Sequence, residues 1–303
     1  MRKVGIMSMQ RIANYGSFLQ AYALKQLIEE VDCNVEFVDY HVGAPVITEN
    51  ADSKNKVIRK IEKGLETFRY RAPLAHKLSF IRYKQSFAQK YMPLLEIADE
   101  MNYNPTVDCL VIGSDEVFNC IQKNSNVGYS PELFGKNNHA KKLITYAASF
   151  GNTTLEKLEK YKKANEVGAL LKKFDAISVR DANSGTIVEQ LTGKEPVYNL
   201  DPVLIYDYMN CCDKIPQVQT NEKYLILYAY AGRISNDEAD WIAAYAKKKN
   251  LNVYAIGGIQ KCADRFVDCS PFEVLAYFRN AEEVITDTFH GSIFSAITHR
   301  PFT

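Results

Sequence analysis

The sequence has no apolar run that approaches the roughly 20 residues needed to cross a bilayer. Its seven cysteines are odd in number and form no Cys-x-x-Cys pair, which disfavours both a disulfide scaffold and a zinc site. Its five histidines lack metal-ligand spacing with a carboxylate or a thiol, so no metal is predicted. No Gly-x-Gly-x-x-Gly motif occurs, and no strand end carries Gly-x-Ser-x-Gly. A dinucleotide site and a serine-hydrolase elbow are therefore disfavoured.

Hydrophobic residues make up 47% of the 303-residue chain and charged residues 24%, which is enough apolar material for a sizeable core. The N-terminal stretch Met1–Met7 is too short for the apolar region of a signal peptide and is interpreted as a strand. Free thiols such as Cys109, within an apolar run, are expected in a reducing compartment. We therefore expect a cytoplasmic protein.

Apolar runs of strand length alternate along the chain with segments of helical periodicity, such as the helix expected at 155–172, which predicts α/β domains with mainly parallel sheets. The alternation pauses at a polar segment around Asp201-Pro202 and then restarts. We expect two Rossmann-like domains, residues 1–200 and 201–303, with a helical basic insertion at 53–92 in the first. The two helices of this insertion are expected at 56–68 and 74–91. Ligands of such sheets bind beyond the carboxyl ends of the strands.

The first two candidate sites follow strands near residues 7 and 112. Asn14-Tyr15-Gly16 forms a polar turn that opens into a helix, whose free N–H groups favour an anionic or polar ligand. An ordinary turn with Ser17 as the helix cap is the alternative. Gly113-Ser114-Asp115 places a hydroxyl and a carboxylate at a strand end, where Asp115 could act as a general base or orient a substrate hydroxyl. Capping chemistry is again the alternative.

Two further candidates carry ionisable groups. Arg180 ends the apolar run 176–179, where a cation is costly unless it meets an anion or an acidic partner. Residues 286–292 run from a strand into a helix expected to begin at Gly291, and they contain Asp287, His290 and Ser292. Histidine exchanges protons near neutral pH, and the helix start offers N–H groups to a phosphate. This last turn is the strongest site candidate.

Taken together, the ordered motifs resemble the polysaccharide pyruvyl transferase family along almost the whole chain. The matching segments are Asn14-Tyr15-Gly16 with Leu19-Gln20-Ala21, Val111-Ile-Gly-Ser-Asp115, Tyr146-Ala-Ala-Ser-Phe-Gly151, Ile177-Ser-Val-Arg180, Leu200-Asp-Pro202 and Thr286-Asp-Thr-Phe-His-Gly291. The resemblance implies two facing Rossmann-like domains, as in type B glycosyltransferases, with the active site in the cleft between them. It also implies a C-terminal domain shortened relative to the family, because relatives continue beyond the elements present here.

The family transfers the enolpyruvyl unit of phosphoenolpyruvate to a sugar of a cell-surface polysaccharide precursor, usually as a cyclic pyruvate ketal. The resemblance thus implies phosphoenolpyruvate as donor substrate, no cofactor, and a sugar or lipid-linked oligosaccharide as acceptor. Arg180, Arg233 and the amides after His290 would hold the donor's anionic groups. His290 would protonate the donor, and Asp115 would be the base or orient the acceptor. Glu116, Phe118 and Thr288 depart from the commoner Gln, Trp and Ser, which leaves the acceptor sugar open.

The basic segment 53–90 carries eleven Lys or Arg residues and two Glu, so its net charge is +9 in a chain of net charge +1. Aromatic residues at helical spacing, Phe80, Tyr83 and Phe87, are expected to face the core. Solvated surface helices are one interpretation, and docking to an anionic membrane at its inner face or to a lipid-linked diphosphate is the other. Nucleic-acid binding is not expected, because the overall charge is near zero and no recognised module is present.

Two alternatives to pyruvyl transfer remain open at this point. A nucleotide-sugar glycosyltransferase of similar architecture is favoured by fold alone, which is weak evidence for function. A non-catalytic sugar-binding relative is the other, against which Asp115, Arg180 and His290 argue. Stabilisation by phosphoenolpyruvate or by a uridine diphosphate sugar would separate these readings.

Overall fold

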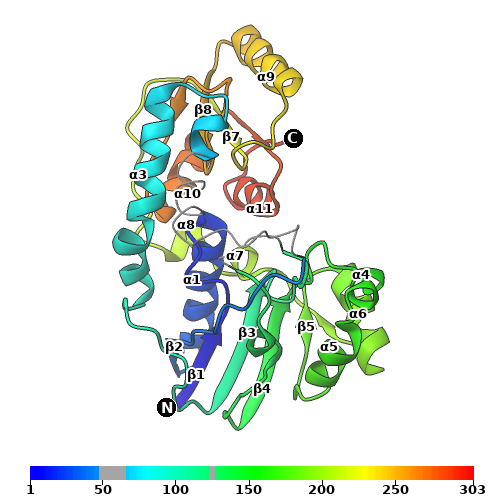
Figure 1. Cartoon of the computed structure of the whole chain (residues 1–303). Coiled ribbons are helices and arrows are strands. Elements are labelled where there is room, and N and C mark those ends of the chain that lie inside the picture. The colour runs from blue at the N-terminus through cyan, green and yellow to red at the C-terminus, as the bar shows by residue number, and fades with distance from the viewer. Residues whose placement is uncertain (48–65, 123–126) are drawn as a thin grey trace. The chain divides into compact units, whose positions relative to one another are not determined.

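The computed structural model describes residues 1–47, 66–122 and 127–303. Contacts divide the chain into two compact units (Figure 1). Unit 1 comprises residues 1–12, 17–50 and 92–206, and unit 2 comprises residues 13–16, 51–91 and 207–303. The α/β class with parallel sheets is confirmed in both. The units are not the two contiguous halves expected from the sequence, because residues 13–16 and the insertion belong with the C-terminal elements.

The core of unit 1 is a six-stranded sheet in the order β2-β1-β3-β4-β5-β6, with every pairing parallel. Two of its inner strands, β1 and β3, are largely buried and mostly apolar, as expected for parallel strands covered on both faces. The strands are β1 (Arg2–Met7), β2 (Cys33–Phe37), β3 (Cys109–Asp115), β4 (Lys142–Ala148), β5 (Ser178–Val179) and β6 (Val197–Tyr198).

One predicted helix of unit 1 is divided into two shorter helices. The segment 155–172, expected to be one helix, breaks at residues 161–163, where Lys162 takes a left-handed φ of 56°. The C-terminal helix of this pair, α5, packs on α6. The elements are α1 (Tyr15–Glu29), α4 (Leu155–Lys160), α5 (Ala164–Leu171), α6 (Ala182–Thr192) and α7 (Pro202–Ile205), with 3₁₀ turns at Met92–Leu95 and Pro131–Phe134.

Unit 2 has a four-stranded parallel sheet in the order β10-β7-β8-β9. Its central strand β7 is completely buried. Helices α9 and α10 each begin with a full capping box, in which a serine and a glutamate three residues later exchange hydrogen bonds. The elements are α3 (Leu74–Tyr91), α8 (Tyr208–Cys211), β7 (Tyr224–Tyr228), α9 (Asn236–Lys249), β8 (Asn252–Ile256), β9 (Arg265–Phe266), α10 (Pro271–Asn280), β10 (Glu283–Thr286) and α11 (Phe289–Ile297).

Helix α3 explains why the insertion joins unit 2. Its aromatic residues Phe80, Tyr83 and Phe87 are buried, as the sequence predicts. Phe80 and Tyr83 contact Phe266 of β9, and Tyr83 and Phe87 contact Tyr15. This aromatic cluster fixes α3 and residues 13–16 to the same sheet, a tertiary choice that no local pattern encodes. The expected helix at 56–68 lies mostly outside the described residues, which resume as a helical turn at 66–69.

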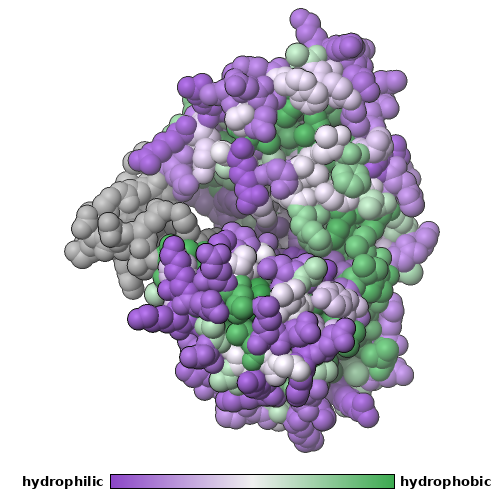
Figure 2. Space-filling view, turned by 90° about the vertical axis from the view of Figure 1, so that its right-hand side faces the viewer, coloured by the Kyte–Doolittle hydropathy of each residue, from purple (hydrophilic) through white to green (hydrophobic). Residues whose placement is uncertain are grey.

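The surface is predominantly hydrophilic on the face shown in Figure 2, with hydrophobic areas between the polar side chains. None of the helices in the described part of the chain is both long and apolar enough to cross a membrane. Several exposed apolar side chains cluster in the sequence after α6, namely Val197, Tyr198, Leu200, Leu204 and Ile205.

Candidate functional site

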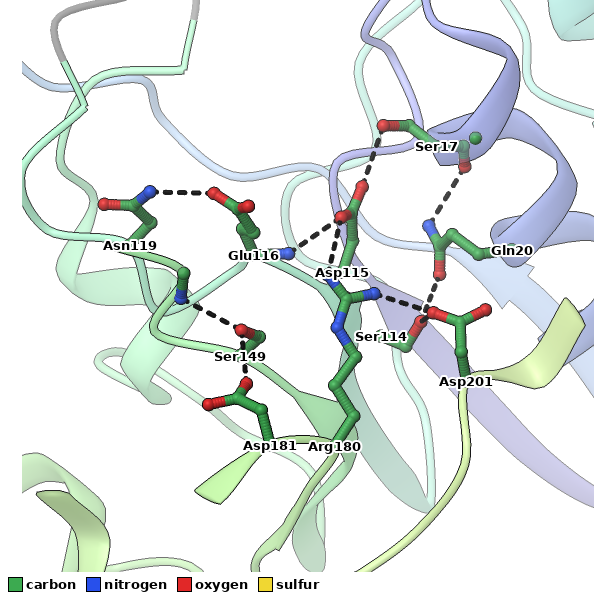
Figure 3. Close-up of polar contacts among 12 residues, drawn as sticks. Ser17, Gln20, Ser114, Asp115, Glu116, Asn119, Ser149, Arg180, Asp181 and Asp201 are labelled. Atoms are coloured by element: carbon green, nitrogen blue, oxygen red, sulfur yellow. Dashed lines mark hydrogen bonds and ion pairs between the residues drawn. The ribbon is translucent and has the colours of Figure 1, made fainter. Parts of the chain in front are cut away.

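In unit 1, Asp115 lies at the carboxyl end of β3 and is 8% exposed, within a closely connected polar network (Figure 3). Its carboxylate accepts hydrogen bonds from the hydroxyl of Ser17 (2.8 Å) and from the backbone N–H of Glu116 (2.9 Å). Arg180 is its ionic partner at 3.4 Å. A hydroxyl, a backbone N–H and a guanidinium group thus hold this carboxylate in place. This arrangement suits a carboxylate that orients a hydroxyl group.

Arg180 follows β5 and points at two carboxylates, Asp115 and Asp201 (Figure 3). Its guanidinium donates to Asp201 at 2.7 Å, and only 6% of its side chain is exposed. Burial alone would lower the pKa of Arg180, but the negative charges of Asp115 and Asp201 outweigh burial and raise it. The sequence offered an acidic partner as one alternative for this arginine, and the structure shows two such partners.

Ser114 joins this network through its hydroxyl, which donates to Gln20 at 2.9 Å and contacts Asp201 at 3.4 Å. Gln20 in turn donates to the carbonyl of Ser17, three residues earlier in α1. Gly113 precedes Ser114 with φ 121°, and a Cβ there would collide with the carbonyl of Tyr146 on β4. Only glycine therefore fits, so the strand end that presents Ser114 and Asp115 depends on it.

In unit 2, His290 lies in the first turn of α11, which begins at Phe289, two residues before the predicted start at Gly291. Thr288 is the cap, and its hydroxyl accepts the N–H of Gly291 at 2.9 Å. Thr286 anchors the turn to β7 by donating to the carbonyl of Tyr228. The imidazole is thus held at a helix N-terminus, where the helix dipole favours an anion. Ser292 contacts the carbonyl of Thr288 through its hydroxyl.

Gly16 packs directly against His290. A Cβ at residue 16 would collide with the imidazole ring, so the close approach of the polypeptide to His290 requires glycine here. Asn14 shapes the turn, because its side-chain oxygen accepts the N–H of Gly16 at 2.7 Å. The amide of Asn14 donates to the hydroxyl of Tyr230, which follows β7. The predicted turn at 14–16 and the predicted turn at 286–292 therefore meet within unit 2.

Three other predicted site residues have partners of their own. Tyr15 is 1% exposed and its hydroxyl donates to the carbonyl of Cys269, which places it in the core of unit 2. Arg233 and Asp287, both predicted to bind substrate, form an ion pair with each other at 3.3 Å. Arg233 also stacks over the ring of Tyr230. More than half of the Arg233 side chain is exposed, so this pair is weak and accessible.

The prediction from sequence missed three participants. Asp201 was noted only within a motif, yet it is the nearest partner of Arg180. Ser17 was taken as a helix cap, but it lies inside α1 and donates to Asp115. Lys84 was grouped with a basic surface, yet it lines a pocket at the carboxyl ends of the unit 2 strands. The sequence signal that could have identified Lys84 is its position among the aromatic residues of α3. No group of metal-ligating side chains large enough to hold an ion occurs among the described residues.

The sequence profile of the polysaccharide pyruvyl transferase family matches residues 14–303. No curated protein matches the chain. The UDP complex of S. aureus MnaA is similar in structure, with a TM-score of 0.51 at 11% identity over 100% of this chain and 78% of the other. The UDP-N-acetylglucosamine 2-epimerase of Rickettsia bellii gives the same four values. At such low identity these two structures show the fold alone.

Proposed function

The chain belongs to the polysaccharide pyruvyl transferase family, and we propose that it transfers the pyruvyl group of phosphoenolpyruvate to a sugar of a polysaccharide or of its lipid-linked precursor. The products are a pyruvate ketal and inorganic phosphate. The observation that carries this proposal is the family match, which covers every candidate site residue from Asn14 to Ser292. The geometry within each unit supports specific roles for these residues.

The reaction needs a proton on the methylene carbon of the donor and two new carbon–oxygen bonds at the neighbouring carbon. In the proposal His290 delivers the proton that turns the methylene into a methyl group, while the first sugar hydroxyl bonds to that neighbouring carbon. The second hydroxyl then displaces phosphate and closes the ketal. The two hydroxyls release two protons, one of which reprotonates His290 while the other leaves with phosphate. Histidine suits this exchange because its two forms are close in energy near neutral pH.

Asp115 is proposed to orient the acceptor hydroxyl. Arg180 and Ser17 hold its carboxylate in one position, and Arg180 is best described as a positioning residue because both of its carboxylate partners lie within the protein. Such fixation matters because a displacement of about 1 Å can cost about 100-fold in rate. Asp115→Asn keeps the size of the side chain but removes its charge, so it should reduce turnover while leaving donor binding intact.

The test combines ligand-induced melting shifts with phosphate release from phosphoenolpyruvate in the presence of candidate sugar acceptors. We expect phosphoenolpyruvate to raise the melting temperature and uridine diphosphate N-acetylglucosamine not to do so. His290→Ala should bind the donor and lose about 100-fold or more in turnover, which is the range of general acid catalysis. The matched control is His299→Asn, because residue 299 follows the same helix and Asn tolerates its left-handed φ of 56°.

Two outcomes would contradict the proposal. Near-normal turnover in His290→Ala would remove the acid role of that residue. Stabilisation by the uridine diphosphate sugar without any effect of phosphoenolpyruvate would exclude the proposed donor and favour glycosyl transfer.

A further inference from the structure

Lys84 lies in α3 and is far in sequence from the two motifs that unit 2 contributes to the candidate site, the turns at 14–16 and 286–292. Its ammonium group donates to the carbonyl of Ala13 at 2.9 Å and lies 5.5 Å from the ring centre of Tyr83 and 5.6 Å from that of Phe80. No carboxylate pairs with it among the residues that the structure describes. Lys84 therefore keeps two of its three donor hydrogens for another partner.

The pocket that Lys84 lines belongs entirely to unit 2. It lies at the carboxyl ends of β7, β8 and β10, which is where ligands of open parallel sheets bind. The lining also provides polar side chains from Asn14, Tyr230 and Thr288. Asn14 donates to Tyr230 and holds Gly16 against His290, while Thr288 caps the helix that carries His290. The pocket is therefore built by the same hydrogen bonds that position the imidazole.

The size of the pocket limits what enters it. Its volume is about 10 Å³, close to the minimum that admits one water molecule. A nucleotide base or a sugar ring is far too large, whereas the terminal oxygens of a carboxylate or a phosphate fit. Lys84 is exposed, so its ammonium group can meet an anion that enters from solvent. Partial desolvation of its side chain lowers the pKa of Lys84, and an anion beside it would favour the charged form.

We propose that Lys84 binds a terminal anionic group, carboxylate or phosphate, in the pocket formed by Asn14, Tyr230 and Thr288. In combination with the proposed function, this group belongs to phosphoenolpyruvate. The contrast with the arginines supports the assignment, since Arg180 has two carboxylate partners and Arg233 has Asp287. Lys84 is then a substrate-binding residue of unit 2 that is distinct from the proposed acid.

The test compares Lys84→Met with Lys77→Met. Methionine retains the apolar stem and removes the charge, and Lys77 is a matched control because it lies in the same helix and also donates to a backbone carbonyl, that of Phe68 at 2.9 Å. Binding of phosphoenolpyruvate, inorganic phosphate and pyruvate is measured by calorimetry on all three proteins. We expect Lys84→Met to weaken anion binding about 10- to 100-fold, the usual loss for a hydrogen bond to a charged group, and Lys77→Met to stay within threefold of wild type.

The probes and kinetics separate this proposal from the proposed function. Preferential loss of phosphate or of pyruvate binding identifies which end of the donor Lys84 holds. In steady-state assays Lys84→Met should raise KM more than it lowers kcat, and Lys84→Arg should recover part of the affinity, which a purely structural lysine would not do. Phosphate binding that depends on Lys84, without any binding of phosphoenolpyruvate, would keep this site and refute the donor. If Lys84→Met binds phosphoenolpyruvate as tightly as the wild type does, the site is refuted and the donor is kept. A wild type that binds none of the three anions would refute both.

Discussion

Replacing Gly16 by alanine should have two opposing effects on stability, a gain in helix propensity and a collision with a neighbouring side chain. Gly16 is the second residue of α1 and does not have a left-handed φ, so alanine would ordinarily stabilise the helix by about 0.5–1 kcal/mol. The added Cβ, however, would collide with the imidazole of His290. Overpacking of this kind costs about 1–3 kcal/mol. We therefore expect Gly16→Ala to destabilise unit 2 by up to about 2 kcal/mol.

The same change should become stabilising when the ring is absent. In a His290→Ala background the collision disappears and only the gain in helix propensity remains, about 0.5–1 kcal/mol. The two substitutions should thus show a coupling energy of about 1–3 kcal/mol, far above the 0.3–0.5 kcal/mol within which independent sites add. In the wild-type background Gly16→Ala should also reduce turnover about 100-fold, because the displaced imidazole no longer meets the donor.

The measurement is urea denaturation of the four proteins in the cycle, followed by tryptophan fluorescence. The only tryptophan in the sequence, Trp241, lies in α9, so its emission reports on unit 2. A coupling energy below about 0.5 kcal/mol, with Gly16→Ala equally tolerated in both backgrounds, would show that Gly16 and His290 do not pack against each other. That result would also undermine the positioning of the imidazole on which its proposed role rests.

Two further predictions concern charge. Arg180→Met should destabilise unit 1 by about 3–5 kcal/mol, because it leaves two buried carboxylates without their cation. Urea denaturation followed by circular dichroism measures this loss, and an additional Asp201→Asn change should recover part of it. A loss below about 1 kcal/mol would contradict the buried network. Unit 2 should lose stability between pH 10 and pH 12, because burial, joined for Tyr70 by Glu66, raises the pKa of Tyr70 and of Tyr91 to about 12. Since their folded pKa lies above the unfolded value near 10, this stabilisation is complete below pH 10 and disappears as the pH rises toward 12. Tyrosinate absorbance and Trp241 fluorescence should therefore change together; tyrosines that all titrate near pH 10 in a folded protein would contradict this.

Periodicity and strand-end motifs predicted much of this fold, because both are local. Helix α3 spans the predicted residues, Asp115 and Arg180 lie at strand ends as expected, and His290 lies in the first turn of the helix that follows β10. What the sequence could not provide is the set of partners. Asp201 is 21 residues from Arg180, and the carbonyl of Ala13 is 71 residues from Lys84. Such contacts depend on how the chain returns to the sheet, and no spacing rule encodes them.

Local sequence patterns could not predict which segments belong to which unit, for the same physical reason. An aromatic stripe at helical spacing predicts that α3 buries one face, but it does not say against which sheet. Tyr15 and Phe266, which pack on that stripe, are far apart in sequence and belong to the start of α1 and to a two-residue strand. The helix start at residue 289 was displaced from its predicted position by a single side chain, because Thr288 supplies the cap that Gly291 cannot.

The distribution of charge favours Lys84 over Arg180 as the cation of the proposed donor site. Arg180 and its two carboxylates carry a net charge of −1, so an approaching anion meets repulsion there; at 4 Å and an effective dielectric constant near 20, each unit charge contributes about 4 kcal/mol. Lys84 has no carboxylate within ion-pair distance among the described residues, and its exposed ammonium group is accessible to an anion. Arg180, at a strand end, is the more conspicuous cation in the sequence, but it is paired with two carboxylates and positions Asp115. Among Arg180, Arg233 and Lys84, the lysine that the sequence groups with a solvated helix face is therefore the one that best fits the proposed anion site.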